Sequence, residues 1–285
     1  GSAERQSGPR PERTKSSAAP EAGPGKVRVK ICPRPAGRSN YRLAHLIAVT
    51  RNNQGEDGQA AYCLAAVQLN KGCPAKLIRL VPGTGHFWAE AGAPVNGLPE
   101  EMRHIHSKPE NGIPWEPQWQ FRPFVVSYEK GSLPDAVTGP HRHDDVVTRN
   151  LKYVEPLEDN DELDEQLFRI STDQVEEVWP RSWWATKKSL LPEAPVTSLA
   201  VFRGRITWIE WRPGASPRLH LQIGDTLIPE VPYAAHRLQG DKGYDALCWL
   251  KEHCECMFLL GLSRTFAKTG ITPQCPILLL RVFPM

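Results

Sequence analysis

Proline is the feature of this chain that most constrains its fold. The sequence holds 27 prolines among 285 residues, and they are spread over most of its length. Proline lacks a backbone N–H and clashes with the preceding helical turn, so each interior proline ends or kinks a helix. The apolar runs between the prolines are short and are separated by clusters of Gly, Asn and Asp, which is typical of antiparallel strands and hairpins. The sequence therefore disfavours an all-α protein and favours a mainly β (α+β) fold.

The predicted strands fall into two groups. The first group comprises residues 43–49, 60–69, 76–81 and 122–128, and the second comprises residues 196–202, 205–211, 218–223, 226–231, 256–262 and 277–283. Within the second group, Arg203-Gly204, Pro213-Gly214 and Gly224-Asp225 are interpreted as tight turns. Residues 244–252 fit an amphipathic helix. The two groups predict two small β-barrels, with one larger mixed sandwich as the alternative.

Charge is distributed unevenly along the chain. The net charge is +3, but residues 1–42 hold ten Lys or Arg and three Glu, which gives this segment +7 and leaves −4 for the rest. Residues 1 to about 26 are rich in Pro, Gly, Ser and charge, and cannot bury enough apolar surface to offset the entropy of ordering. Residues 151–177 form an acidic segment with a few apolar positions, which predicts a connector with one or two short helices. We expect a disordered basic tail before the barrels and an acidic connector between them.

Several short segments resemble a known family. They are residues 43–50 followed by 62–66, then 76–81, 140–145 and 260–266. In this order they resemble the motifs of the dual OB-domain family over residues 41–285, although Lys76, Leu80 and Ala66 stand where that family has Trp, Pro and Gly. The resemblance implies paired OB folds with a presumed nucleic-acid role and no established chemistry.

These observations together predict the domain organisation. We expect a disordered basic tail at 1–40, a first OB-like domain at 41–150, an acidic helical connector at 151–194 and a second OB-like domain at 195–285. No run of apolar residues is long enough to span a membrane, and the first residues lack the apolar stretch of a secretory signal. The seven cysteines are irregularly spaced, which favours reduced thiols over a disulfide framework. The sequence thus predicts a cytoplasmic protein with no membrane association.

One strand carries the main candidate for nucleic-acid binding. An OB barrel grips single strands with cations for the backbone and exposed rings for the bases. Arg203, Arg205 and Trp211 share one parity and Trp208 has the other, so we expect one of the two tryptophans to pack inward unless a bulge intervenes. The face with Arg203, Arg205 and Trp211 is either this interface or ordinary surface and interdomain packing.

Two further groups complete the prediction. The last hairpin carries Arg264, Phe266 and Lys268, in a loop that often borders the ligand groove of OB folds. Arg79 lies inside an apolar strand and needs a partner, which is either a structural ion pair, the favoured interpretation, or a phosphate. The predicted nucleic-acid-binding residues are Arg79, Arg203, Arg205, Trp211, Arg264, Phe266 and Lys268.

Metal binding and catalysis have weaker support. In a strand, His141 and His143 would point to the same side and could hold an ion with Asp145, but paired Cys or His motifs of a structural zinc site do not occur cleanly. We predict no metal, no cofactor and no catalytic residue. The chain also lacks nucleophile-elbow, phosphate-loop and deaminase motifs.

The favoured function is therefore non-catalytic binding of single-stranded DNA or RNA, as an accessory subunit of a larger complex. One alternative is a protein–protein interaction scaffold that grips its partner with Trp/Pro-rich loops at residues 86–121 and 179–184. Another is a metal-dependent nuclease that uses Asp144 and Asp145, or carboxylates of the connector, together with His141 or His143.

Overall fold

The structure is a computed structural model that describes eleven segments of the chain. They are residues 41–52, 61–68, 75–83, 87–89, 123–132, 141–157, 161–180, 197–211, 216–234, 241–263 and 277–285. The predicted tail at residues 1–40 lies outside them. Residues Asn40–Met285 belong to one compact unit.

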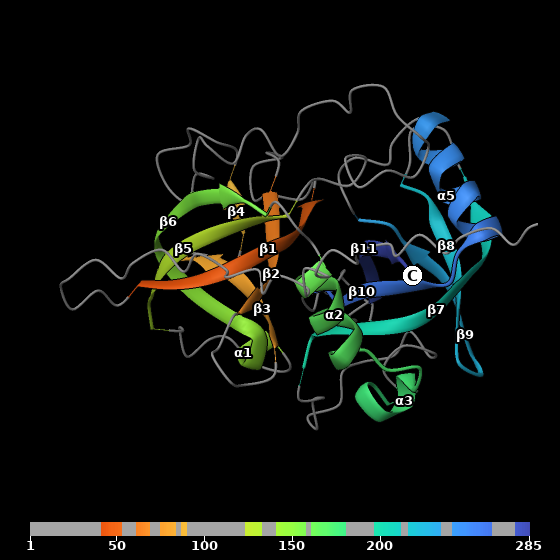
Figure 1. Ribbon diagram of the computed structural model, residues 1–285, viewed down its shortest axis with the longest axis horizontal. Coiled ribbons are helices and arrows are strands. Elements are labelled where there is room, and N and C mark those ends of the chain that lie inside the picture. Colours follow the sequence, from red (N-terminus) through yellow and green to blue (C-terminus); the bar gives the residue numbers. More distant parts are fainter. Residues whose placement is uncertain are drawn as a thin grey trace, which may run out of the picture. The chain divides into compact units, whose positions relative to one another are not determined.

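The first sheet closes into a five-stranded barrel. The strands of this sheet are β1 (Tyr41–Asn52), β2 (Ala61–Gln68), β3 (Lys76–Pro82), β4 (Trp88–Ala89), β5 (Phe124–Lys130) and β6 (Asp145–Pro156). The short β4 pairs with β2 outside the ring, which the other five strands form. They follow the order β1-β5-β6-β3-β2-β4, and an additional pairing of β1 with β2 closes the ring. Strands β3 and β6 are parallel, whereas the other neighbours in the ring are antiparallel. Figure 1 shows this barrel in the warm and light-green part of the chain.

The second sheet repeats this connectivity. Its strands are β7 (Leu199–Glu210), β8 (Arg218–Ile223), β9 (Thr226–Pro232), β10 (Cys256–Leu262) and β11 (Ile277–Pro284), in the order β11-β10-β7-β8-β9. A parallel bridge joins Tyr233 to Leu279, and the Ala234 N–H donates to the Leu279 carbonyl at 2.9 Å. In the second barrel, β7 thus pairs with β8 and β10, and the end of β9 meets β11 in parallel. The first barrel has the same connectivity, because β1 pairs with β2 and β5, and β3 pairs with β6 in parallel. Both barrels have the OB-type arrangement of five strands, and the mainly β prediction is confirmed.

Within the described segments, four helices accompany the strands. They are α1 (His141–Asp144), α2 (Asp161–Ile170), α3 (Val175–Val178) and α5 (Asp241–His253). In α2, Leu163 and Leu167 lie one turn apart and are buried while the acidic side chains of the helix face solvent, which is the amphipathic pattern expected of a surface helix. Helix α5 lies between β9 and β10 in the chain, and its Leu247 and Leu250 join the core of the second barrel.

Strand β10 contributes to two hydrophobic cores. All seven of its residues are buried. Because successive side chains of a strand point to opposite faces, Phe258 and Leu260 fill the second barrel, while Met257 and Leu259 join the core cluster that is built mainly from the first barrel. Leu280 and Phe283 of β11 join that same cluster. The two barrels are therefore held together by apolar packing.

Two boundaries differ from the sequence-based expectation. Residues Arg203-Gly204 are not a turn: β7 runs through them without a break. It pairs with β10 up to Gly204 and with β8 from Arg205 onward, so the glycine is the point where the strand passes from one half of the barrel to the other. Strand β6 continues to Pro156, past the expected domain boundary at residue 150.

The buried histidine of β1 makes stability sensitive to pH. His45 is 7% exposed, and burial lowers its pKa from the usual value. In the unfolded chain the pKa of His45 is about 6.5. Below that pH the imidazole is therefore protonated in the unfolded state, while in the folded state it stays neutral down to a lower pH. We expect the free energy of unfolding to fall as the pH drops below about 6.5. Urea unfolding of wild type and His45→Gln between pH 7.5 and 5 checks this: the variant should lose part of the dependence, and identical profiles would contradict it.

Candidate nucleic-acid interface

The outer surface of β7, β8 and β9 carries an exposed tryptophan. Strand β7 has a bulge: Ile206 pairs with Leu221 and Trp208 pairs with His220, so Thr207 is an extra residue. The bulge lets Ile206 and Ile209 both point into the core, although their spacing gives them opposite parity. Trp208, between them, points outward and is 58% exposed. We call the outward side chains of these strands the Trp208 face: Arg203, Arg205, Trp208, Arg218, His220, Gln222, Leu227 and Glu230.

Trp208 of β7 and Trp211, the residue that follows β7, are therefore placed differently from the prediction. Trp208 shares the outer face with Arg203 and Arg205, and Trp211 does not take that place. Trp211 is half-buried, and its ring packs against Tyr244 of α5 with the centroids 5.4 Å apart. Neither ring packs fully inward. The bulge is the physical reason, because one additional residue reverses the alternation of side chains beyond it.

Helix α5 adds a cation that sequence reasoning missed. The Lys251 ammonium lies 5.5 Å from the centroid of the Trp208 ring, within the range of a cation–π contact. Lys251 is exposed and belongs to the last turn of α5. More than forty residues separate it from Trp208, and no local pattern in the sequence indicates that the two meet.

The two arginines at the start of the face have different surroundings. The Arg203 guanidinium lies 4.0 Å from an Asp173 carboxylate oxygen and 5.1 Å from the centroid of the Phe168 ring. Both partners come from the acidic connector, whose Thr172 forms a parallel bridge to β7. Arg205 is exposed and lies opposite Gln222. Within the described part of the chain, no carboxylate lies within 4.0 Å of the Arg205 guanidinium.

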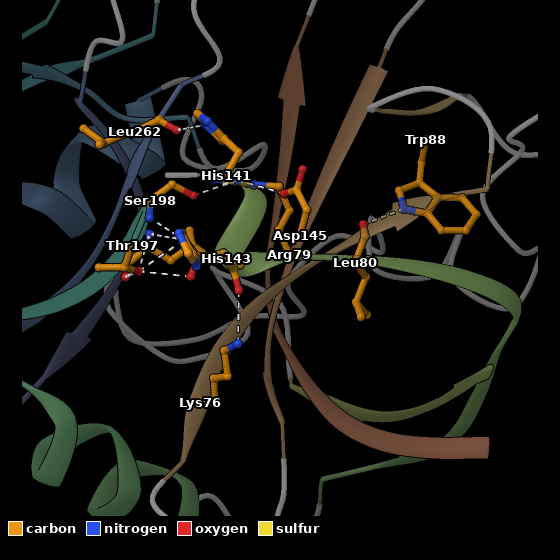
Figure 2. A network of polar contacts seen from close by, with 12 residues as sticks. Lys76, Arg79, Leu80, Trp88, His141, His143, Asp145, Thr197, Ser198 and Leu262 are labelled. Atoms are coloured by element: carbon orange, nitrogen blue, oxygen red, sulfur yellow. Dashed lines mark hydrogen bonds and ion pairs between the residues drawn. The ribbon is translucent and has the colours of Figure 1, made fainter. Parts of the chain in front are cut away.

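Arg79 has the structural role that the sequence favoured. It is 6% exposed, and its Nη1 lies 3.2 Å from Asp145 and donates to the Ser198 Oγ at 2.9 Å. Asp145 is the first residue of β6 and the register partner of Arg79 in β3, whereas Ser198 immediately precedes β7. Figure 2 shows Arg79 between these two side chains. The prediction that Arg79 binds a phosphate is corrected here, because its guanidinium is buried and already paired with Asp145 and Ser198.

Asp144 holds the beginning of the second barrel. Its carboxylate accepts the backbone N–H of Ser198, the N–H of Leu199 at 3.2 Å and the hydroxyl of Thr197 at 3.1 Å. Burial raises the pKa of Asp144, and these donors together with the Arg79 charge oppose that rise. The carboxylate thus supplies acceptors for N–H groups that precede the regular ladder of β7. It connects α1 of the first barrel to the first strand of the second.

The three residues considered for a metal site have separate roles. Residues 141–144 form a helical turn, where side chains two apart do not point to the same side. The His141 Nε2 hydrogen-bonds the Leu262 carbonyl at 3.0 Å, and the His143 carbonyl accepts from the Lys76 ammonium at 3.0 Å (Figure 2). Asp145 pairs with Arg79. Across the segments that the structure describes, no three His, Cys, Asp or Glu side chains form a group that could hold a metal ion.

Two tryptophans from the predicted partner-gripping loops are buried. The Trp88 ring is 7% exposed and donates its Nε1–H to the Leu80 carbonyl at 2.9 Å. Trp179 is fully buried, donates to the Thr197 carbonyl at 2.9 Å and meets the Phe202 ring edge-on. Both rings belong to the hydrophobic cores of the protein and are not exposed for a partner to bind. Of these loops the structure describes only residues 87–89 and 179–180; the other loop residues, together with Arg264, Phe266 and Lys268, lie outside the described residues.

Comparisons with known proteins add little. No family model and no curated protein sequence matches the chain. A solved murine DNA-binding protein, bound to double-stranded DNA, is similar at a TM-score of 0.28 and 8% identity, covering 86% of this chain and 96% of that one. So low a TM-score supports no inference about fold or ligand. Among the described residues, no helix is long and apolar enough to cross a membrane.

Proposed function

We propose that this protein binds single-stranded nucleic acid without catalysing a reaction, and that the Trp208 face of the second barrel makes the contact. One observation carries the proposal: an exposed tryptophan stands on the outer face of an OB-type barrel with a lysine ammonium 5.5 Å from its ring. Arg205 adds a second exposed cation on the same face. A flat ring beside cations suits a ligand with stacked bases and an anionic backbone.

The first barrel offers a contrast. The second and third strands of an OB barrel often bind oligonucleotides, but in the first barrel the corresponding strands are covered. Residues 64–67 of β2 and 77–81 of β3 are buried without interruption, so side chains on both faces of these strands are enclosed. In the second barrel, β8 alternates between buried and more exposed positions, and β9 buries only Ile228 and Val231. This difference favours the second barrel as the ligand-binding one.

The ligand must present an unpaired base. Stacking on the Trp208 ring requires the face of a base, and in a duplex those faces are covered by neighbouring base pairs. Single-stranded DNA and unpaired RNA both satisfy this requirement. The acidic net charge outside the tail does not oppose the proposal, because exposed charges farther away than about 8–10 Å are screened at physiological salt.

The remaining parts of the proposal rest on the sequence. Two OB-type barrels, with the segments that resemble the family motifs lying in or beside β1, β2, β3, α1 and β10, support membership of the dual OB-domain family. A place as accessory subunit of a larger complex and a cytoplasmic location stay predictions.

Replacing Trp208 tests the proposed function. We expect Trp208→Ala to weaken binding of a fluorescent oligothymidylate or oligouridylate by about 5- to 150-fold, because base–aromatic stacking contributes ~1–3 kcal/mol per base. Trp208→Phe should retain most of the affinity. Fluorescence anisotropy at low salt measures both.

Tyr41→Ala is the matched control, because Tyr41 is an exposed aromatic residue on β1 of the first barrel, 41% exposed. Its affinity should equal that of wild type. Two outcomes would refute the assignment: no binding by the wild-type protein at low salt, or equal losses in Trp208→Ala and Tyr41→Ala.

A further inference from the structure

The cations of the Trp208 face divide into two classes according to their partners. Arg203 lies 4.0 Å from Asp173, and Arg218 lies 3.8 Å from Glu230. Arg205 and Lys251 are both exposed, and within the described segments neither has a carboxylate within 4.0 Å. Two cations of this face, Arg203 and Arg218, are thus paired within the protein. Arg205 of the face and Lys251 of the neighbouring helix α5 are open to an external anion.

The paired cations lie toward the two ends of the face. Arg203 precedes Arg205 on β7 and is also held over the Phe168 ring of the connector. Arg218 lies at the far end of β8, opposite Glu210 of β7 and beside Glu230 of β9. A phosphate that approaches either arginine therefore meets a carboxylate as well. At an exposed site the ion pair itself contributes little stability, but it cancels the local charge that would attract a phosphate.

We infer that the site is bounded by these two ion pairs and takes a short unpaired segment of nucleic acid. One base stacks on Trp208, and the adjoining phosphates meet Arg205 and Lys251. Lys251 leaves its position over the ring when a base takes that place, and its flexible stem lets the ammonium turn to a phosphate. A segment of this length is at the low end of the ~4–16 nucleotides that an OB fold covers. This inference rests on the proposed function.

Salt dependence separates the two classes of cation. The logarithm of the binding constant falls with the logarithm of salt concentration, with a slope of about −0.7 for each single-strand phosphate neutralised. We expect Arg205→Ala and Lys251→Ala each to make the slope shallower by about 0.7 relative to wild type. We expect Arg203→Ala and Arg218→Ala to leave the slope unchanged. The comparison uses the full chain, so that any contribution of the basic tail is common to all five proteins.

Removing the paired carboxylates provides the converse test. Asp173→Asn and Glu230→Gln release Arg203 and Arg218, and each should steepen the slope by about 0.7 while tightening binding at low salt. Trp208→Ala is measured alongside. Binding that depends on Trp208, but with a shallower slope in Arg203→Ala or Arg218→Ala, would overturn the boundaries and leave the proposed function standing. Binding that does not depend on Trp208 would overturn the proposed function itself.

Discussion

Arg79→Ala should destabilise the protein by about 3–5 kcal/mol, because it leaves the Asp145 carboxylate buried without its opposite charge. Arg79 and Asp145 side chains are 8% and 0% exposed, so water cannot replace the lost partner. The substitution also removes the donor to Ser198, which links the first barrel to the start of β7. Urea unfolding followed by circular dichroism measures the loss.

The double variant Arg79→Ala/Asp145→Ala tells a charge effect from a packing effect. Removing both charges leaves no isolated buried ion, so the double variant should be more stable than Arg79→Ala alone. Arg142→Ala is the surface control: Arg142 is exposed, and its substitution should change stability by less than about 0.5 kcal/mol. A loss below ~1 kcal/mol for Arg79→Ala would show that the pair is not enclosed as described.

Gly204→Ala is the second substitution with a large expected effect. A Cβ at this position would lie 2.1 Å from the Gln222 carbonyl oxygen in the backbone of β8. Because a backbone atom cannot turn aside as a flexible side chain can, β7 and β8 would have to separate. We expect a loss of at least ~3 kcal/mol, at the upper end of overpacking effects, together with loss of nucleic-acid binding, since β7 positions both Arg205 and Trp208.

Gly83→Ala is the matched control, because a Cβ at Gly83 would meet no atom within 4 Å. Its melting temperature should stay close to that of wild type. If Gly204→Ala melted within a degree or two of Gly83→Ala, the close approach of β7 to β8 would be wrong.

Local patterns predicted the strands whose apolar residues are contiguous or alternate regularly. The runs at 218–223, 226–231 and 256–262 coincide closely with β8, β9 and β10. Strand β6 was missed because its outward residues are polar and Asn150 has a φ of 51°, which interrupts the alternation. The prediction of a turn at Arg203-Gly204 was wrong. A glycine is found in tight turns and also inside strands where two backbones approach closely, and the sequence alone does not distinguish the two cases.

The candidate site could be predicted only in part. Arg205 and the aromatic residues in and next to β7 could be recognised in the sequence. Strict alternation of side chains predicted that Trp211 shares the face of Arg205. The bulge at Thr207 places Trp208 there instead. Lys251 comes from a helix far along the chain, and the partners of Arg203 come from the connector. Such contacts depend on the closed barrel, which residue spacing does not encode.

Strand β10 limits how this protein can be divided or diversified. Phe258 and Met257 point into two different cores, so neither side of the strand is left to face water. If the second barrel were produced without the first, the side chains of β10 that now pack against the first barrel would form an exposed hydrophobic surface, and the isolated barrel would tend to aggregate. The loops of the second barrel can therefore vary in evolution, whereas the two barrels have to be retained together.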